Sequence, residues 1–153
     1  MRRQVHVPVS VGALVRMSSA QRDKVFRSSP AGDVPSGKGD GVALLPLGPV
    51  PTRVVAAVIR ALIWRGKVFD PRYDGLRNRM TPFGLRLIRA KVYKDPSWVD
   101  GQECIVLNYS RTSFVAHWIR DEIREVAVCT YLGQVFVRGR KLLHFTLTFP
   151  PSA

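Results

Sequence analysis

The sequence predicts a small, mainly β domain, folded as an antiparallel β-barrel of about seven or eight strands with one or two short helices. In the last third of the chain, Leu143, Phe145, Leu147 and Phe149 alternate with polar residues, which is typical of a strand with one buried face. In addition, turn signals recur at short intervals between apolar runs. Short strands separated in this way favour a sandwich or a barrel.

Length and composition limit the number of domains. The chain has 153 residues, of which 46% are apolar and 23% charged, so it suits one globular domain with a real core. We predict that this domain covers residues 23–150 and that residues 1–22 form a flexible N-terminal extension. Apolar runs are all shorter than the ~18 residues of a transmembrane helix, so no such segment is expected.

The first half of the chain contains the clearer helix signals. Residues 21–29 fit a short helix, and residues 30–41 are rich in Gly, Pro, Ser and Asp, which predicts a loop. A first strand is expected at 42–47. Residues 52–63 form the best helix candidate, because Thr52 is a good N-cap and apolar residues follow at helical spacing.

The second half is dominated by strand signals. Strands are expected at residues 64–69, 76–83, 85–94, 104–109, 131–137 and 142–149. The segment 85–94 also fits a helix, and we favour the strand. Residues 114–126 fit either element equally well. As a strand, this segment would place Arg120, Glu122 and Arg124 on one side.

Positive charge is concentrated in the middle of the chain. The net charge is +13, from 24 basic and 11 acidic residues. Segment 53–94 holds 11 of the basic residues against Asp70 and Asp74. Such an excess attracts nucleic acid or acidic lipid, although a solvated basic face is the simpler interpretation. Nucleic-acid binding is not favoured, because no recognised nucleic-acid-binding motif is present.

The two cysteines suggest a reducing compartment. Cys104 and Cys129 lie inside apolar runs and have no metal-ligand neighbours at a useful spacing. We therefore predict two buried free thiols and a cytoplasmic location, with a disulfide as the alternative. No metal or cofactor is expected.

A weak acid/base group is present near residue 120. His117, Asp121 and Glu122 are the best candidates, since a histidine beside a carboxylate can serve as a base. The alternative is a surface ion-pair patch formed with Arg120 and Arg124.

Large amphipathic aromatics and a few polar residues are candidates for lining a ligand cavity. The predicted ligand-binding residues are Trp64, Asn78, Trp98, Asn108, Tyr109, Trp118, Arg120 and Tyr131. Ordinary core packing is the alternative role for the aromatic residues.

Several segments together resemble a known group of proteins. They are residues 64–69 (WRGKVF), 97–101 (SWVDG), 107–110 (LNYS), 119–124 (IRDEIR) and 131–133 (YLG). Over residues 30–149 the chain resembles an uncharacterised group of bacterial lipocalin-like (calycin-like) β-barrel proteins. The resemblance implies an antiparallel barrel with a short helix and a central cavity, and it implies no catalytic residues. An aspartate is more usual in that group where this chain has Asn108.

These observations favour one function over two alternatives. The favoured function is binding of a small lipophilic or aromatic molecule in an apolar barrel cavity. The first alternative is a cofactor-independent enzyme of isomerase or cyclase type that uses the same cavity. The second is binding of nucleic acid or acidic lipid through the basic middle segment. The sequence does not specify the oligomeric state.

Overall fold

The computed structural model describes residues 7–44, 64–70, 75–80, 89–108 and 119–151. Within residues 64–70, 75–80 and 89–90 it describes the course of the backbone alone. The predicted helix over residues 52–63 lies outside the described residues.

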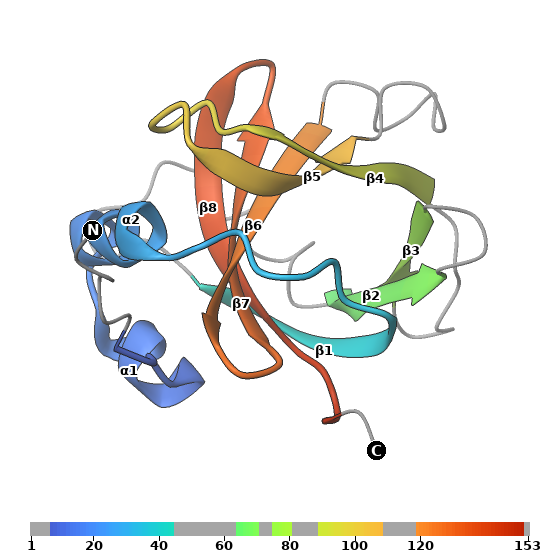
Figure 1. Cartoon of the computed structure of the whole chain (residues 1–153), viewed down its shortest axis with the longest axis horizontal. Helices are drawn as coiled ribbons and strands as arrows, with labels where there is room; N and C mark the ends of the chain where they lie inside the picture. Colours follow the sequence, from blue (N-terminus) through green and yellow to red (C-terminus); the bar gives the residue numbers. More distant parts are fainter. Residues whose placement is uncertain (1–6, 45–63, 71–74, 81–88, 109–118, 152–153) are drawn as a thin grey trace, which may run out of the picture.

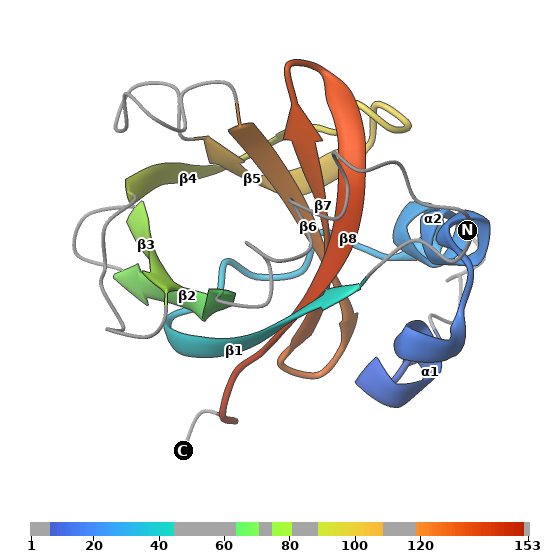
Figure 2. The same cartoon turned by 180° about the vertical axis from the view of Figure 1, so that it is seen from behind.

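The described part of the chain forms an antiparallel β structure with two short helices. The strands are β1 (Gly37–Leu44), β2 (Trp64–Asp70), β3 (Gly75–Met80), β4 (Arg89–Pro96), β5 (Glu103–Asn108), β6 (Ile119–Ala127), β7 (Thr130–Val137) and β8 (Arg140–Thr148). Each strand pairs with the next, and β1 also pairs with β8, so the order of pairing closes on itself (Figures 1 and 2). The prediction of a mainly β chain with short helices is confirmed.

Both segments that had fitted a helix or a strand contain a strand in the structure. The strand choice for 85–94 is confirmed from Arg89 onward, where β4 pairs with β3 and β5. In the undecided segment 114–126, β6 begins at Ile119 and pairs with β5 and β7. Residues 114–118 lie outside the described residues. The local hydrophobic periodicity of these segments does not distinguish a helix from a strand. Pairing with the neighbouring strands therefore determines their conformation.

The first strand begins earlier than its composition predicts. Residues 37–41 belong to β1 and not to a loop, because Gly39 and its neighbours pair with both β2 and β8. Glycine is required at position 39 by close packing. A Cβ atom there would lie 2.5 Å from Cζ of Phe149. Gly39, which resembled a loop residue, thus makes room for an aromatic ring.

The prediction of a flexible extension over residues 1–22 is wrong for residues 11–22. Residues 11–16 form α1 (Val11–Arg16), residues 19–22 begin α2 (Ser19–Ser28), and Leu14 is fully buried. The physical reason is capping. Ser18 Oγ accepts from the Gln21 backbone N–H at 3.2 Å, and the Gln21 side chain accepts from the Ser18 N–H at 2.8 Å. The predicted helix over 21–29 corresponds to all of α2 except its first two residues, together with its C-cap Ser29.

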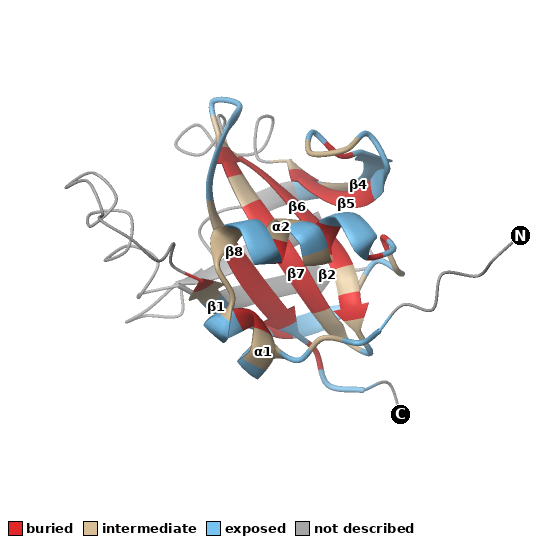
Figure 3. Cartoon of the chain, turned by 90° about the vertical axis from the view of Figure 1, so that its left-hand side faces the viewer, coloured by how far each residue is buried: buried red, intermediate tan, exposed pale blue. Residues whose placement is uncertain are grey.

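The eight paired strands β1–β8 form a ring, here called the strand ring, whose wall has an inner and an outer face. One apolar cluster lies on each face. The inner cluster consists of Ile105, Leu107, Ile123, Tyr131, Phe145, Leu147 and Phe149. The outer cluster consists of Leu14, Phe26, Leu44, Cys104, Val106, Val126 and Leu132. Side chains alternate between the two faces along each strand. The outer cluster includes residues of both helices because α2 crosses the outside of β6, β7 and β8 (Figure 3).

The connection between α2 and β1, residues 29–36, is bound to one end of the strand ring. The Tyr131 hydroxyl donates to the backbone oxygen of Asp33 at 2.6 Å, and the Glu125 N–H donates to the Pro30 oxygen at 3.1 Å. Gly32 has a φ of +73° and packs so closely on Glu125 that a Cβ atom would overlap its side chain. These contacts link the helices to the ring.

Candidate functional site

Asp121 is a buried carboxylate on the inner face of the ring. It shares the side of β6 that carries Ile123, a member of the inner cluster, because residues two apart point the same way. Its cross-strand partners are Leu107 and Val135, both of which belong to or pack against that cluster. Only 3% of Asp121 is exposed. An acidic group therefore lies on the part of the inner surface, from β5 to β8, whose described side chains are largely apolar.

Aromatic side chains fill the inner face on the side of Asp121 that leads to residues 29–36. The Phe145 ring lies over Gly133, where a Cβ atom would overlap its Cζ atom. The Tyr131 and Phe149 rings meet edge to face with centroids 5.7 Å apart. Along β7 from Val135, the partner of Asp121, toward the end of the ring that contacts residues 29–36, the next inner-facing residues are Gly133 and Tyr131. Asp121 thus lies beyond the aromatic layers.

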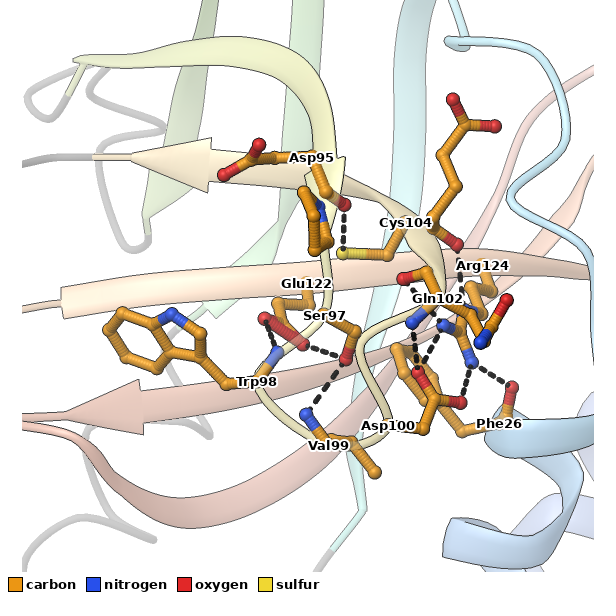
Figure 4. A network of polar contacts seen from close by, with 12 residues as sticks. Phe26, Asp95, Ser97, Trp98, Val99, Asp100, Gln102, Cys104, Glu122 and Arg124 are labelled. Atoms are coloured by element: carbon orange, nitrogen blue, oxygen red, sulfur yellow. Dashed lines mark hydrogen bonds and ion pairs between the residues drawn. The ribbon is translucent and has the colours of Figure 1, made fainter.

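Glu122 faces the opposite side from Asp121. Its carboxylate accepts from Ser97 Oγ at 2.6 Å and from the Trp98 N–H at 2.9 Å (Figure 4). Ser97 and Trp98 lie between β4 and β5. Adjacent strand residues point to opposite faces. The predicted acid/base group is therefore not assembled as one site on β6, and its third member, His117, lies outside the described residues.

Arg120 completes the hydrogen bonding around Glu122 on the outer face. Its Nε and Nη2 atoms donate to Glu122 Oε2 at 3.1 and 2.9 Å, and Nη2 also donates to the Pro96 oxygen at 3.0 Å. The guanidinium carbon lies 4.2 Å from the centroid of the Trp98 ring. Glu122 is fully buried. Paired and hydrogen-bonded in this way, it has a structural role.

Arg124 joins three parts of the outer face. Its two Nη atoms each donate to a carboxylate oxygen of Asp100 at 2.7 Å. The remaining donors reach backbone oxygens of Phe26 at 2.9 Å, Gln102 at 3.0 Å and Glu103 at 3.1 Å (Figure 4). All five N–H donors of the guanidinium are therefore used. Hydrogen bonding by Arg124 lowers the pKa of Asp100, although burial opposes this shift.

The predicted ligand-lining residues divide between the two faces. Tyr131 belongs to the inner cluster. Trp98, Asn108 and Arg120 lie on the outer face, where the Asn108 amide donates to the Tyr93 hydroxyl at 2.9 Å. The predicted set also includes Trp64 and Asn78, whose side chains are not described, and Tyr109 and Trp118, which lie outside the described residues.

A second charged cluster under α2 is not among the predicted sites. His144 Nε2 lies 2.9 Å from Asp23 Oδ1, and Lys141 Nζ lies 2.5 Å from Asp23 Oδ2. Burial lowers the pKa of His144, although Asp23 opposes the shift. Burial raises the pKa of Asp23, but hydrogen bonds from Lys141 and His144 outweigh it and leave this pKa lowered. Alternation in β8 placed His144 on the polar face, but nothing in the sequence indicated that a helix covers it.

Both cysteines are free thiols. Cys104 is fully buried, and burial raises its pKa to about 12. Cys129 is partly buried. Over the ranges that the structure describes, no group of three or more His, Cys, Asp or Glu residues is placed to hold a metal ion. The helices in those ranges are too short or too polar to cross a membrane.

Comparisons with known proteins indicate the fold alone. No family profile matches the chain, and no curated protein matches it. A crystal structure of a protein from Thermomonospora curvata is similar, with a TM-score of 0.60 over 88% of each chain. The two sequences are 17% identical. This chain therefore shares its overall fold with a protein from that bacterium.

Proposed function

We propose that the strand ring binds a small lipophilic molecule inside it, with Asp121 as the polar anchor. The observation that carries the proposal is the buried carboxylate of Asp121, whose described neighbours on the inner face of β5 to β8 are largely apolar. Ligand sites are mostly apolar surfaces on which a small number of polar groups fix the orientation of the ligand. A carboxylate accepts hydrogen bonds, so the ligand would carry a hydroxyl, amine or other donor on an apolar or aromatic body.

The layering of the inner face supports one location for this ligand. The layers of Tyr131, Phe145 and Phe149 are filled by their own rings. Beyond Asp121, the register continues to the pair Ile119 and Val137, which is apolar. The ligand would therefore lie on the Asp121 side of the aromatic layers and enter from the end opposite residues 29–36.

The proposal extends to the class of protein. An antiparallel ring of eight strands is the size that encloses one small ligand, as in lipocalins. We therefore propose that the chain is a lipocalin-like binding protein of bacterial type. Its free thiols are consistent with a cytoplasmic location. The enzyme alternative retains Asp121 alone from its acid/base group within the described residues, so binding has the better support.

Native mass spectrometry of the purified chain, followed by denaturing extraction, tests this function first. A co-purifying lipophile with a hydrogen-bond donor is the expected result. As a defined probe, N-phenyl-1-naphthylamine combines an apolar aromatic body with one N–H donor. Its fluorescence is expected to rise saturably on addition of the protein.

Asp121→Asn keeps the size of the side chain and removes its charge. We expect this variant to bind the probe about tenfold or more weakly, because a hydrogen bond to a charged group contributes about 1.5–3 kcal/mol. Asp95→Asn is the matched control, since Asp95 is an exposed acid on β4. Failure of the wild-type chain to take up the probe, or equal affinity in the Asp121→Asn variant, would contradict the proposal.

A further inference from the structure

Trp98 is an exposed aromatic side chain held in a fixed position. It lies between β4 and β5 with 56% of its surface exposed. Its backbone N–H donates to Glu122, and the Arg120 guanidinium lies against its ring at 4.2 Å. Phe136 meets the ring edge to face, with centroids 5.4 Å apart. Figure 4 shows the indole extending away from the polar network beneath it.

The groups that hold Trp98 are buried, although the indole itself is exposed. Glu122 is 0%, Ser97 4% and Arg120 9% exposed. After the cost of desolvation, a buried ion pair contributes little net stability. Here it fixes a turn and one aromatic ring. An exposed ring that is already ordered loses little conformational entropy when a partner stacks on it.

Basic residues lie on the strands that follow one another up to Trp98. β2, β3 and β4 are neighbours in the ring. Together they carry seven basic and two acidic residues, namely Arg65, Lys67, Arg77, Arg79, Arg89, Lys91 and Lys94 against Asp70 and Asp95. In β5, β6 and β7 acidic residues outnumber basic ones, with Glu103, Asp121, Glu122 and Glu125 against Arg120 and Arg124. By their register, Arg77, Arg79, Arg89 and Lys91 lie at outer-face positions of β3 and β4, whereas Lys67 and Lys94 pair with Gly39 and Ile105 of the inner face. The outer face of β3 and β4 therefore carries positive charge, and Trp98 lies just after the end of β4.

A row of cross-strand partners connects the basic strands to the indole. Lys91 on β4 is exposed and pairs with Asn108 on β5, which in turn pairs with Arg120 on β6. Because partners in register share a face, all three lie on the outer surface, and Arg120 lies directly against Trp98. Neighbouring strands are about 4.8 Å apart, so Lys91 and Arg120 are separated by about 10 Å along the wall.

We propose that this surface binds single-stranded nucleic acid, with an unpaired base stacked on Trp98 and the phosphate backbone running over the outer face of β3 and β4. Single-strand binding combines a positively charged track with aromatic rings on which bases stack. The chain supplies both in adjacent positions, and its net charge of +13 favours a polyanionic partner. The surface is outside the ring, so it is separate from the ligand site proposed around Asp121.

Fluorescence anisotropy with a fluorescein-labelled oligothymidylate of 12 nucleotides tests the proposal. The wild-type chain is expected to bind it with an affinity that falls as salt rises. Trp98→Ala is expected to weaken binding about 5- to 150-fold, the loss of one base stack. Trp98→Phe keeps a ring and is expected to restore most of the affinity. Circular dichroism confirms that each variant is folded.

Charge is tested separately from stacking. Lys91→Gln is expected to reduce the slope of log affinity against log salt by about 0.7, the value for one phosphate contact on a single strand. Its matched control is Lys24→Gln, an exposed lysine on α2, which is expected to leave the slope unchanged.

Three results would overturn the proposal. One is unchanged affinity for the oligonucleotide in Trp98→Ala. Another is tighter binding to a 12-base-pair duplex than to the single strand, because paired bases do not offer a face for stacking. The third is binding to phosphatidylglycerol vesicles without binding to the oligonucleotide, which would identify an acidic membrane as the partner.

Discussion

Replacing Arg124 by methionine removes the side chain that joins α2, the β4–β5 connection and β6. Methionine preserves the apolar stem that packs near Phe26, whose ring centroid lies 4.5 Å from the guanidinium carbon. The substitution eliminates five hydrogen bonds and leaves the Asp100 carboxylate, whose side chain is 15% exposed, without its partner. Removing one member of a buried ion pair costs about 3–5 kcal/mol.

Urea unfolding at pH 7 measures this cost. For a denaturant slope of about 2 kcal/mol/M, a loss of about 4 kcal/mol lowers the unfolding midpoint by about 2 M. Arg140→Met is the control, because Arg140 is exposed at the start of β8. We expect the control to change the free energy of unfolding by less than about 0.5 kcal/mol.

The same variant also changes how the free energy of unfolding depends on pH in the acid range. The pKa of Asp100 is lowered chiefly by Arg124, so its carboxylate contributes stability that is present above its ordinary value of 3.8. That contribution is lost as the pH falls through 3.8 toward the lower pKa of the folded state. In Arg124→Met, the loss of stability over this pH range should be smaller. Equal unfolding free energies for Arg124→Met and Arg140→Met would refute the assignment of Arg124 as the joining residue.

Three further outcomes follow from the packing and the titratable groups. Gly133→Ala places a methyl group against the Phe145 ring and should destabilise the chain by about 1–3 kcal/mol, seen as a lower melting temperature that Gly133→Ala combined with Phe145→Leu partly restores. Because burial lowers the pKa of His144, stability is full above the ordinary value of 6.5 and should fall as the pH drops below it; urea midpoints at pH 7 and 5 should differ less in His144→Gln, and an equal difference would contradict this role. In the native protein Cys104 should resist a thiol reagent while Cys129 reacts, because Cys104 is fully buried and its pKa is raised to about 12; mass spectrometry of the labelled peptides distinguishes the two.

Many of the strands could be predicted, because the residue patterns that indicate a strand are local in the sequence. The alternation of Leu143, Phe145 and Leu147 with polar residues is enough by itself to identify β8 and its inner face, although His144 and Thr146 on the other face are buried as well. The N-terminal helices carried a local signal as well, in the Ser18 to Gln21 spacing of a capping box, and this signal was missed.

The candidate site was harder to predict because burial on the outer face depends on distant segments. The strand alternative for residues 114–126 places Arg120, Glu122 and Arg124 on one side, and they share one side of β6. That side is buried and not exposed, because α2 and the β4–β5 connection cover it. The bond from Arg124 to Phe26 spans 98 residues of sequence. No local sequence pattern indicates such a contact. The separation of Asp121 from Glu122 onto opposite faces follows only when residues 119–127 are assigned to a strand, β6.

The pairing of β1 with β8 and the contact between Arg124 and Phe26 have a consequence for folding. Both join the beginning of the chain to its last strands. Contacts between residues far apart in sequence slow folding, because the chain must close a long loop before they form. During synthesis, α1, α2 and β1 leave the ribosome well before β6 and β8. We expect the N-terminal helices to dock last, after their partner strands have emerged, which makes docking of α2 a late event in the folding of this protein.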